Sequence, residues 1–298
     1  MIPPCSSPDG LQPSAGWTAG DCALQHDPFV AWVSFNEVPT VKLPSDLLEG
    51  KKGLVVGIAN DQSIATGCAM AFAAGGADLA ITYLNEKARP HVAPVAQACN
   101  APILMPLNVE HDGEMEAVFD QIARQWGRLD FVLHSIAFCP SDDLHGRVVD
   151  CSRIGFARAM DVSVHSFMRM AKLAEPLMTD GGCMLTVSYY GAEKVVDHYN
   201  VMGPVKAALE SVMRYMAAEL GSKGIRVNAL SPGPVATRAA SGIDHFDALI
   251  DEAKSRAPVH RLVTIEEIGA LAACMVSGYA TSVTGNLSYV DAGFHVMS

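Results

Sequence analysis

The sequence has little that would tie it to a membrane, a metal ion or a nucleic acid. No apolar run reaches the ~18 residues needed to span a bilayer. The eight cysteines are scattered, without a Cys-x2-Cys pair or a His/Cys cluster of metal-ligand spacing. The net charge of −11 leaves no overall basic surface for a phosphate backbone. We therefore expect no membrane insertion, no bound metal and no nucleic-acid partner.

Basic residues are also missing from the start of the chain. No Lys or Arg precedes Lys42, so the basic segment that opens a secretory signal peptide is absent. Residues 1–46 are rich in Pro, Ser, Gly and Asp and show no periodicity. We expect a mobile tail here, with 29–35 docked on the body as one alternative and a natural start further along the chain as another. The scattered cysteines favour reduced thiols in the cytoplasm.

From Lys51 onward, short apolar runs alternate with longer helical stretches. The apolar runs predict strands at 53–58, 78–82, 101–107, 129–136, 183–187, 227–230 and 287–290. Between them we predict helices at 63–74, 86–98, 112–126, twice within 152–178, at 199–220 and at 264–276. This alternation is typical of βαβ units. We predict an α/β fold, a single doubly wound Rossmann domain over 47–298 with a mostly parallel seven-stranded sheet flanked by helices.

The turn after the first predicted strand suits a dinucleotide pyrophosphate. Such a turn needs small residues and a helix N-terminus that points at the negative charge. Gly57, Ala59 and Gly67 supply small positions, although the Gly-x-Gly-x-x-Gly spacing is absent, and Ser63 can cap the following helix. A strand–helix turn with glycines that serve helix packing explains this segment equally well.

Three further strand ends are expected at the same edge of the sheet. The second strand ends at Leu84-Asn85, and the absence of a basic residue there favours NADH over NADPH. The third strand ends at Asn108-Val109. After the fourth strand, the small residues Ser135 and Ala137 suit the floor of a crevice.

Two tyrosines and a lysine follow the fifth predicted strand. Tyr199 and Lys206 are seven residues apart, which is about two turns of a helix, so they are expected on one helix face. A nearby Lys charge favours the phenolate, and we expect the pKa of Tyr199 to be lowered toward neutrality. Tyr189 is expected at the carboxyl end of the strand, where open α/β sheets bind ligands.

Five blocks in order carry a resemblance to a known family. They are Gly57 to Gly67, His134-Ser135-Ile136-Ala137-Phe138, Ser188-Tyr189-Tyr190-Gly191-Ala192-Glu193, Tyr199-Asn200-Val201-Met202-Gly203 with Lys206, and Arg226-Val227-Asn228-Ala229 running to Thr237-Arg238-Ala239-Ala240-Ser241-Gly242. The chain resembles the short-chain dehydrogenase/reductase superfamily and, more closely, the bacterial enoyl-acyl-carrier-protein reductases. The resemblance covers about residues 47–294.

The resemblance implies NADH-dependent reduction of trans-2-enoyl thioesters on acyl carrier protein, in the fatty acid elongation cycle, by a homotetramer. It implies a cofactor site lined by Gly57, Ser63, Ile64, Asn108, Val109, Ile136, Lys206, Val235, Ala236, Thr237, Arg238 and Ala239. Tyr199 would stabilise the enolate, Lys206 would bond the nicotinamide ribose, and Tyr189 would be the second active-site tyrosine. Substrate contacts would come from Cys139, Tyr189, Met202 and Phe246, the last in a candidate lid over 236–256.

Several features leave alternatives open. Asn108 stands where many relatives have Asp, and Pro204 lies within the predicted catalytic helix, where it would kink the helix or force a later start. A carbonyl reductase of the wider superfamily is a second hypothesis, with Thr186 as the hydroxyl thirteen residues before Tyr199. A third is a silent relative that binds dinucleotide or acyl carrier. Basic candidates for docking an acidic carrier protein are Arg238, Lys254, Arg256 and Arg261, unless they are ordinary surface charges.

Overall fold

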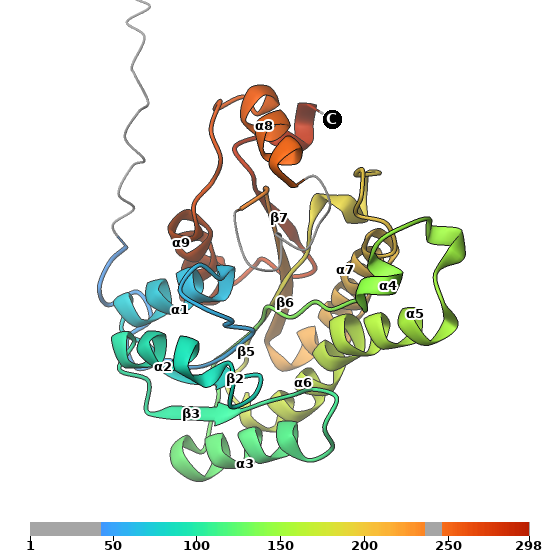
Figure 1. Ribbon diagram of the computed structural model, residues 1–298. Helices are drawn as coiled ribbons and strands as arrows, with labels where there is room; N and C mark the ends of the chain where they lie inside the picture. Colours follow the sequence, from blue (N-terminus) through green and yellow to red (C-terminus); the bar gives the residue numbers. More distant parts are fainter. Residues whose placement is uncertain (1–42, 236–245, 298) are drawn as a thin grey trace, which may run out of the picture. The chain divides into compact units, whose positions relative to one another are not determined.

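The computed structural model describes residues 43–235 and 246–297 (Figure 1). All of them belong to one compact unit, Val41–Ser298. Most of the expected tail and part of the expected lid, residues 236–245, therefore lie outside the described residues. The packed body already includes Leu43 and the buried Leu48, so it begins slightly before the predicted boundary at residue 47.

The described strands form one sheet of seven in the order β3-β2-β1-β4-β5-β6-β7. They are β1 (Lys52–Val56), β2 (Asp78–Tyr83), β3 (Ile103–Pro106), β4 (Phe131–His134), β5 (Gly182–Val187), β6 (Ile225–Pro232) and β7 (Leu287–Val290). Each neighbouring pair of these strands is parallel, which confirms the prediction and makes the sheet more regular than "mostly parallel". The chain order reverses between β1 and β4, the point at which doubly wound sheets bind ligands.

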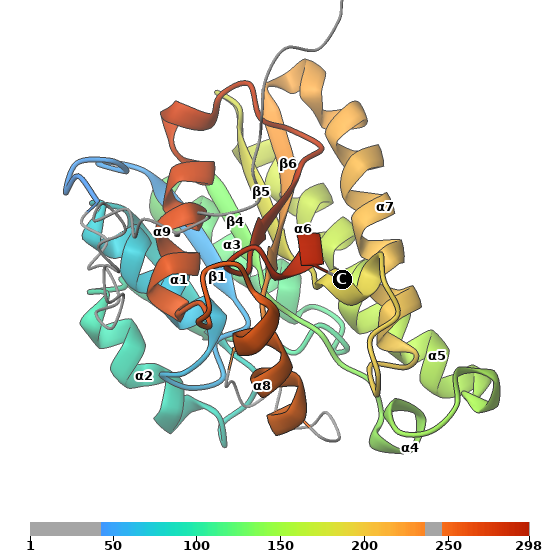
Figure 2. The same ribbon diagram turned by 90° about the horizontal axis from the view of Figure 1, so that it is seen from above.

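Helices cover both faces of the sheet, as Figures 1 and 2 show. One apolar core lies under α1 (Ile64–Ala74), α2 (Arg89–Ala98) and α9 (Ile265–Val276). The other lies under α3 (Glu114–Trp126), α5 (Arg153–Met160), α6 (Ser166–Ala174) and α7 (Met202–Leu220). The short α4 (Ser141–Leu144) and α8 (Phe246–Arg256) stand beyond the carboxyl ends of the strands. The near-continuous apolar runs of the strands follow from this coverage, because a sheet between two helix layers is buried on both sides.

Two helical regions add detail to the prediction. The two stretches predicted within 152–178 are α5 and α6, and a π-helical segment, Asp161–His165, joins them. Helix α7 begins at Met202, three residues later than predicted, so Tyr199 lies in the turn before it. Among the described helices, none is both long and apolar enough to cross a membrane.

Candidate active site

The ends of β1 and β4 meet at the order reversal of the sheet. Val56 pairs with His134 in register, and the Ser135 N–H donates to the Val56 carbonyl at 2.9 Å. Gly57 follows β1 with a φ of 110°, in the left-handed region, and a Cβ placed on it would lie 2.0 Å from the Ser135 carbonyl oxygen. Only glycine fits this position, because its φ is positive and a side chain would overlap the Ser135 backbone.

Ser63 fixes the turn that leads into α1. Its hydroxyl accepts hydrogen bonds from the N–H groups of Ala59 and Asn60, both at 3.0 Å. Ser63 occupies the N-cap position but makes no side-chain bond to the helix, so the expectation that its side chain caps α1 is wrong. The hydroxyl closes the turn and bonds none of the first N–H groups of α1, although the Thr66 N–H donates to the Ser63 carbonyl. A helix N-terminus of this kind can bind an anion.

Gly67 has a packing role in the described structure. A Cβ at this position would lie 2.1 Å from the Ile265 carbonyl oxygen, so α1 and α9 cross at backbone contact there. The alternative interpretation from the sequence, a helix-packing glycine, is the one that this contact supports. Of the positions predicted for the phosphate end, Gly57, Ala59 and Ile64 at the start of α1 remain candidates.

Other predicted cofactor residues follow β2 and β3 at the same edge of the sheet. Leu84 is 54% exposed directly after β2. The Asn108 N–H donates to Glu114 Oε2 at 2.6 Å and its side-chain oxygen accepts from the Glu110 N–H at 3.1 Å, so this side chain shapes its own turn. Val109 is buried beside it.

Other predicted positions on this edge vary in exposure. Ile136 is half-buried, Ala137 is exposed and Val235 is half-buried after β6. The predicted cofactor residues Ala236, Thr237, Arg238 and Ala239 lie outside the described residues.

The two predicted tyrosines are in contact. The ring centroids of Tyr189 and Tyr199 are 4.8 Å apart with an interplanar angle of 63°, an edge-to-face pair. The Tyr189 hydroxyl is buried and has no hydrogen-bond partner within the described part of the chain. A buried hydroxyl without a partner is unfavourable by about 1–3 kcal/mol, which marks it as a donor available to a ligand.

Gly191 allows this pair to form. A Cβ on Gly191 would lie 2.5 Å from Tyr199 Cδ1 and 3.2 Å from Tyr189 Cδ1, so both rings rest against a position without a side chain. Of the predicted substrate residues, Met202 belongs to the same apolar cluster as Tyr199, and Cys139 packs against that cluster. Phe246 is the first residue of α8, but the position of its side chain is not described.

Lys206 reaches the end of β5 from α7. Its ammonium is buried and donates to the Val187 carbonyl at 2.7 Å. Pro204 is the third residue of the helix, and the N–H groups of a first turn have no intrahelical partner, so proline is tolerated there without a kink. The later start anticipated from Pro204 is what the structure has. Tyr199 and Lys206 therefore do not share a helix, and the expected common helix face is wrong.

Asn200 shapes the turn that carries Tyr199. It has a φ of 45°, in the left-handed region that Asn tolerates better than most residues. Its side-chain amide donates to the Leu144 carbonyl at 2.8 Å, which ties the turn to α4. Tyr199 is thus positioned by this turn, whereas Lys206 is positioned by the helix that follows.

Burial controls the protonation of the site. Burial raises the pKa of Tyr199, and the neighbouring Tyr189 and Glu210 add to the increase, so the expected lowering of this pKa is wrong. Burial likewise raises the pKa of Tyr189. Desolvation lowers the pKa of Lys206 to about 8, while Glu210 acts in the opposite direction. Both phenols are therefore neutral at neutral pH, while the Lys206 ammonium at the end of β5 is mostly charged.

A buried histidine that sequence analysis gave no role lies beneath the site. The His134 ring nitrogens contact Thr186 Oγ1 at 2.9 Å and Ser166 Oγ at 2.8 Å. Burial lowers the pKa of His134 to about 3, so the ring is neutral. Thr186 is fully buried in β5 and also donates to the His134 carbonyl, so its hydroxyl is used inside the protein. A histidine within an apolar run was the available signal for this network.

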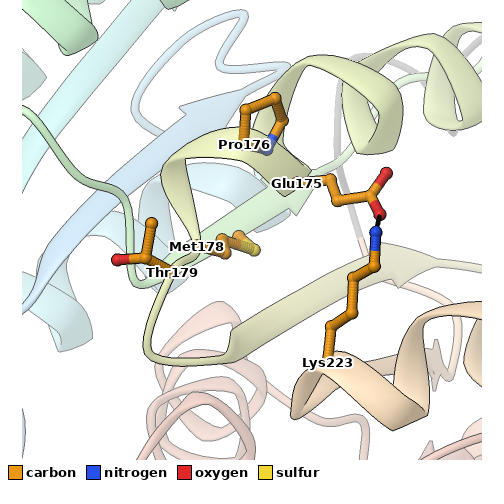
Figure 3. A pocket seen from close by; sticks show the side chains of 5 residues that line it. All are labelled: Glu175, Pro176, Met178, Thr179 and Lys223. Atoms are coloured by element: carbon orange, nitrogen blue, oxygen red, sulfur yellow. Dashed lines mark hydrogen bonds and ion pairs between the residues drawn. The ribbon is translucent and has the colours of Figure 1, made fainter.

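A cavity of about 500 Å³ lies away from these residues, before the start of β5. Figure 3 shows it lined by Glu175, Pro176, Met178, Thr179 and Lys223, with the Lys223 ammonium against the Glu175 carboxylate. No predicted site residue lines it. In the described ranges, no group of three or more His, Cys, Asp or Glu residues is placed to hold a metal.

A parallel sheet with its order reversal at β1 and β4, a glycine turn into a helix, and a tyrosine and lysine beyond β5 define a Rossmann-type α/β protein. The family model described as Enoyl-(Acyl carrier protein) reductase matches residues 57–295. The chain belongs to the enoyl-acyl-carrier-protein reductase family.

Known proteins agree with this assignment. The Rhizobium meliloti protein named enoyl-[acyl-carrier-protein] reductase [NADH] 1 is 46% identical over 253 residues, covering 85% of this chain and 93% of the relative. The crystal structure of the Anaplasma phagocytophilum reductase in complex with NAD has a TM-score of 0.82 at 44% identity, covering 86% and 98% of the two chains. The Bacillus cereus reductase, solved with NADP+ and an indole naphthyridinone, has a TM-score of 0.83 at 41% identity, covering 85% and 99%.

Proposed function

We propose that this protein reduces the 2,3-double bond of trans-2-enoyl thioesters on acyl carrier protein, using NADH, in the fatty acid elongation cycle. The observation that carries the proposal is the buried contact between Tyr189 and Tyr199 after the carboxyl end of β5, where Lys206 bonds the Val187 carbonyl, in a chain of this family. The cytoplasm is the proposed location.

The turn after β1 fits the pyrophosphate of a dinucleotide. Gly57 has no room for a side chain, and the Ser63 hydroxyl accepts from the N–H groups of Ala59 and Asn60 and makes no cap bond to α1. We assign the cofactor to Gly57, Ala59, Ile64, Leu84, Val109, Ile136 and Lys206, with Asn108 shaping the adjacent turn. When bound, the cofactor supplies a hydride to the β-carbon of the substrate. The lack of a basic residue at 84–85 supports NADH as the preferred form.

Tyr199 is proposed to stabilise the negative charge that develops on the thioester carbonyl oxygen. A neutral phenol can donate a hydrogen bond to this oxygen, and the bond strengthens as the charge grows, which lowers the barrier. The Lys206 ammonium adds a fixed positive charge in a buried, weakly screened environment. The Tyr189 hydroxyl, which has no partner in the described part of the chain, is proposed as a second donor.

The carbonyl reductase alternative requires a free hydroxyl at position 186. Thr186 is fully buried and bonded to His134, so it is not available to polarise a ketone. A silent relative is disfavoured because Tyr189, Tyr199 and Lys206 are all present, with the two tyrosines in contact and Lys206 bonded to the last residue of β5.

For the substrate side, Cys139, Met202 and Phe246 are proposed to line the acyl chain, with 236–256 as the lid. Of the basic residues considered for the carrier protein, Arg256 pairs with Glu252 and Arg261 with Glu267. These two ion pairs weaken the case for a basic docking patch, whereas Lys254 is exposed.

A homotetramer is proposed as the assembly. Ile154 on α5 and Tyr215 on α7 are 80% and 75% exposed. Large apolar side chains on neighbouring helices of one face are the kind of surface that subunit contacts bury. Sedimentation velocity would give the assembly state directly, and a monomer at micromolar concentration would contradict this part of the proposal.

The test is NADH oxidation with crotonyl and longer 2-enoyl thioesters, beside 3-ketoacyl thioesters and with NADPH in parallel. We expect turnover of the enoyl set with NADH, and a fall of about 10²–10³-fold in kcat for Tyr199→Phe, as for loss of one oxyanion donor. Turnover of the ketones alone would identify a carbonyl reductase. NADH binding without any turnover would identify a silent relative.

A further inference from the structure

A buried carboxyl group lies one helical turn from Lys206. Glu210 is four residues further along α7, which places it on the same face as Lys206. Both side chains are buried. Burying two ionisable groups is unfavourable unless they interact with each other or with hydrogen-bond partners. The proposed mechanism uses Lys206 but leaves Glu210 without a role.

Glu210 is hydrogen-bonded to the residue that precedes Tyr189. The Ser188 hydroxyl donates to Glu210 Oε1 at 2.5 Å, and Ser188 is itself buried. This distance falls in the range of an O–H···O⁻ bond to an ionised carboxylate. Lys206 donates to the carbonyl of Val187, the residue before Ser188. Helix α7 therefore holds two consecutive residues at the end of β5, directly before Tyr189 leaves the sheet.

The charged groups around this pair come from several elements. Lys206 faces Glu210 from its own helix and His134 from β4, and His134 is neutral because burial lowers its pKa to about 3. Glu210 faces Arg214 from α7 and Glu193 from the segment after β5. Burial raises the pKa of Glu210, whereas the hydrogen bond from Ser188 and the charges of Arg214 and Lys206 favour its ionised form. Glu210 also acts on Tyr289 of β7. Glu210 is the anionic group that favours the charged form of Lys206 against desolvation.

We propose that Glu210 is a positioning residue of this site: its carboxylate keeps Lys206 charged and, through Ser188, anchors the backbone that carries Tyr189. The inference rests on the proposed function for its kinetic consequence, but not for its structural content. Glu210 acts on the site through Lys206 and Ser188, without touching the substrate.

The charge is tested with Glu210→Gln, whose amide oxygen can still accept from Ser188. The matched control is Glu219→Gln, the same change at an exposed position near the end of α7. Lys206 is titrated by NMR of ¹³Cε-labelled lysine, with its resonance assigned by loss in Lys206→Met. We expect the midpoint to fall by about one pH unit in Glu210→Gln, because an opposite charge nearby shifts a pKa by about that much or more. Glu219→Gln should titrate like the wild type.

An equal midpoint in Glu210→Gln and Glu219→Gln would overturn the charge role. The alkaline limb of the pH profile of kcat should shift with the Lys206 midpoint. Loss of a residue needed only for folding would lower activity without shifting this limb. The titration needs no turnover, so a wild type that fails to reduce enoyl thioesters would refute the proposed function and still leave this inference decidable.

The anchor is tested with Ser188→Ala, which keeps the carboxylate and removes its bond. We expect kcat to fall about tenfold, because Tyr189 is displaced when its backbone loses this anchor. KM for NADH and the Lys206 midpoint should stay close to the wild-type values. An unchanged kcat would overturn the anchoring role. If Glu210→Gln does not fold, Glu210→Asp decides the charge role instead. Aspartate keeps the carboxylate, so the Lys206 midpoint must match that of the wild type. Its side chain is shorter and loses the Ser188 contact, so kcat must fall.

Discussion

Gly191→Ala is the substitution that most directly tests the geometry of the tyrosine pair. The added methyl group would lie 2.5 Å and 2.9 Å from Tyr199 Cδ1 and Cε1. Ordinary carbon contacts begin near 3.4 Å, so the Tyr199 ring must move by about 1 Å, and a displacement of that size lowers turnover by about 10²-fold. The φ of Gly191 lies outside the left-handed region, so the alanine backbone itself is allowed.

The assay is NADH oxidation with a 2-enoyl thioester, and thermal unfolding is followed on the same samples. Overpacking at Gly191 is expected to lower the free energy of unfolding by about 1–3 kcal/mol, which leaves a folded protein at 25 °C. Gly221→Ala is the matched control, because nothing lies within 4 Å of a Cβ there. A Gly191→Ala enzyme that turns over as fast as Gly221→Ala would refute the assignment of the reaction to this tyrosine pair.

Two further predictions concern buried polar groups. Tyr189→Phe removes a hydroxyl that has no partner in the described structure, so turnover should fall while the free energy of unfolding, measured in urea, stays equal or rises. Burial lowers the pKa of His134 from 6.5 to about 3, so the unfolded chain takes up a proton in this range that the folded chain does not. The stability from neutral His134 is therefore full above pH 6.5 and is lost as the pH falls toward 3, by about 1.4 kcal/mol per pH unit. Measured in urea, the free energy of unfolding should differ less between pH 7 and pH 5 for His134→Gln than for the wild type. Equal differences would contradict the buried neutral ring.

The fold could be predicted from the sequence because its determinants are local. Each buried strand is a short apolar run, and the connecting helices carry their own periodicity, so the parallel sheet followed from the alternation alone. The doubly wound sheet was inferred from the same alternation, whereas the order of its strands comes from the structure. The start of α7 was not, because Tyr199, Asn200 and Val201 have no strong helix-breaking residue among them, and only Pro204 indicated a later start.

The candidate site was predicted less completely than the fold, because its chemistry depends on contacts between distant residues. Ser188 and Glu210 are 22 positions apart, and Glu210 looks like an ordinary helical carboxylate until α7 is packed against β5. Thr186 and His134 are 52 positions apart and pair through the register of β4 and β5. Sequence spacing identified Tyr189, Tyr199 and Lys206, whereas their protonation required knowledge of burial.

The raised pKa of Tyr199 alters the role that this residue is expected to have. A phenolate beside the substrate would repel the negative charge that forms on the thioester oxygen, whereas a neutral phenol donates a hydrogen bond to it. The burial that disfavours the phenolate therefore favours the oxyanion function. Lys206 keeps its charge in the same environment because Glu210 opposes the effect of desolvation on it. The site thus separates the two tasks, with the hydrogen bond supplied by a tyrosine that stays neutral and the positive charge supplied by a lysine that its neighbour keeps protonated.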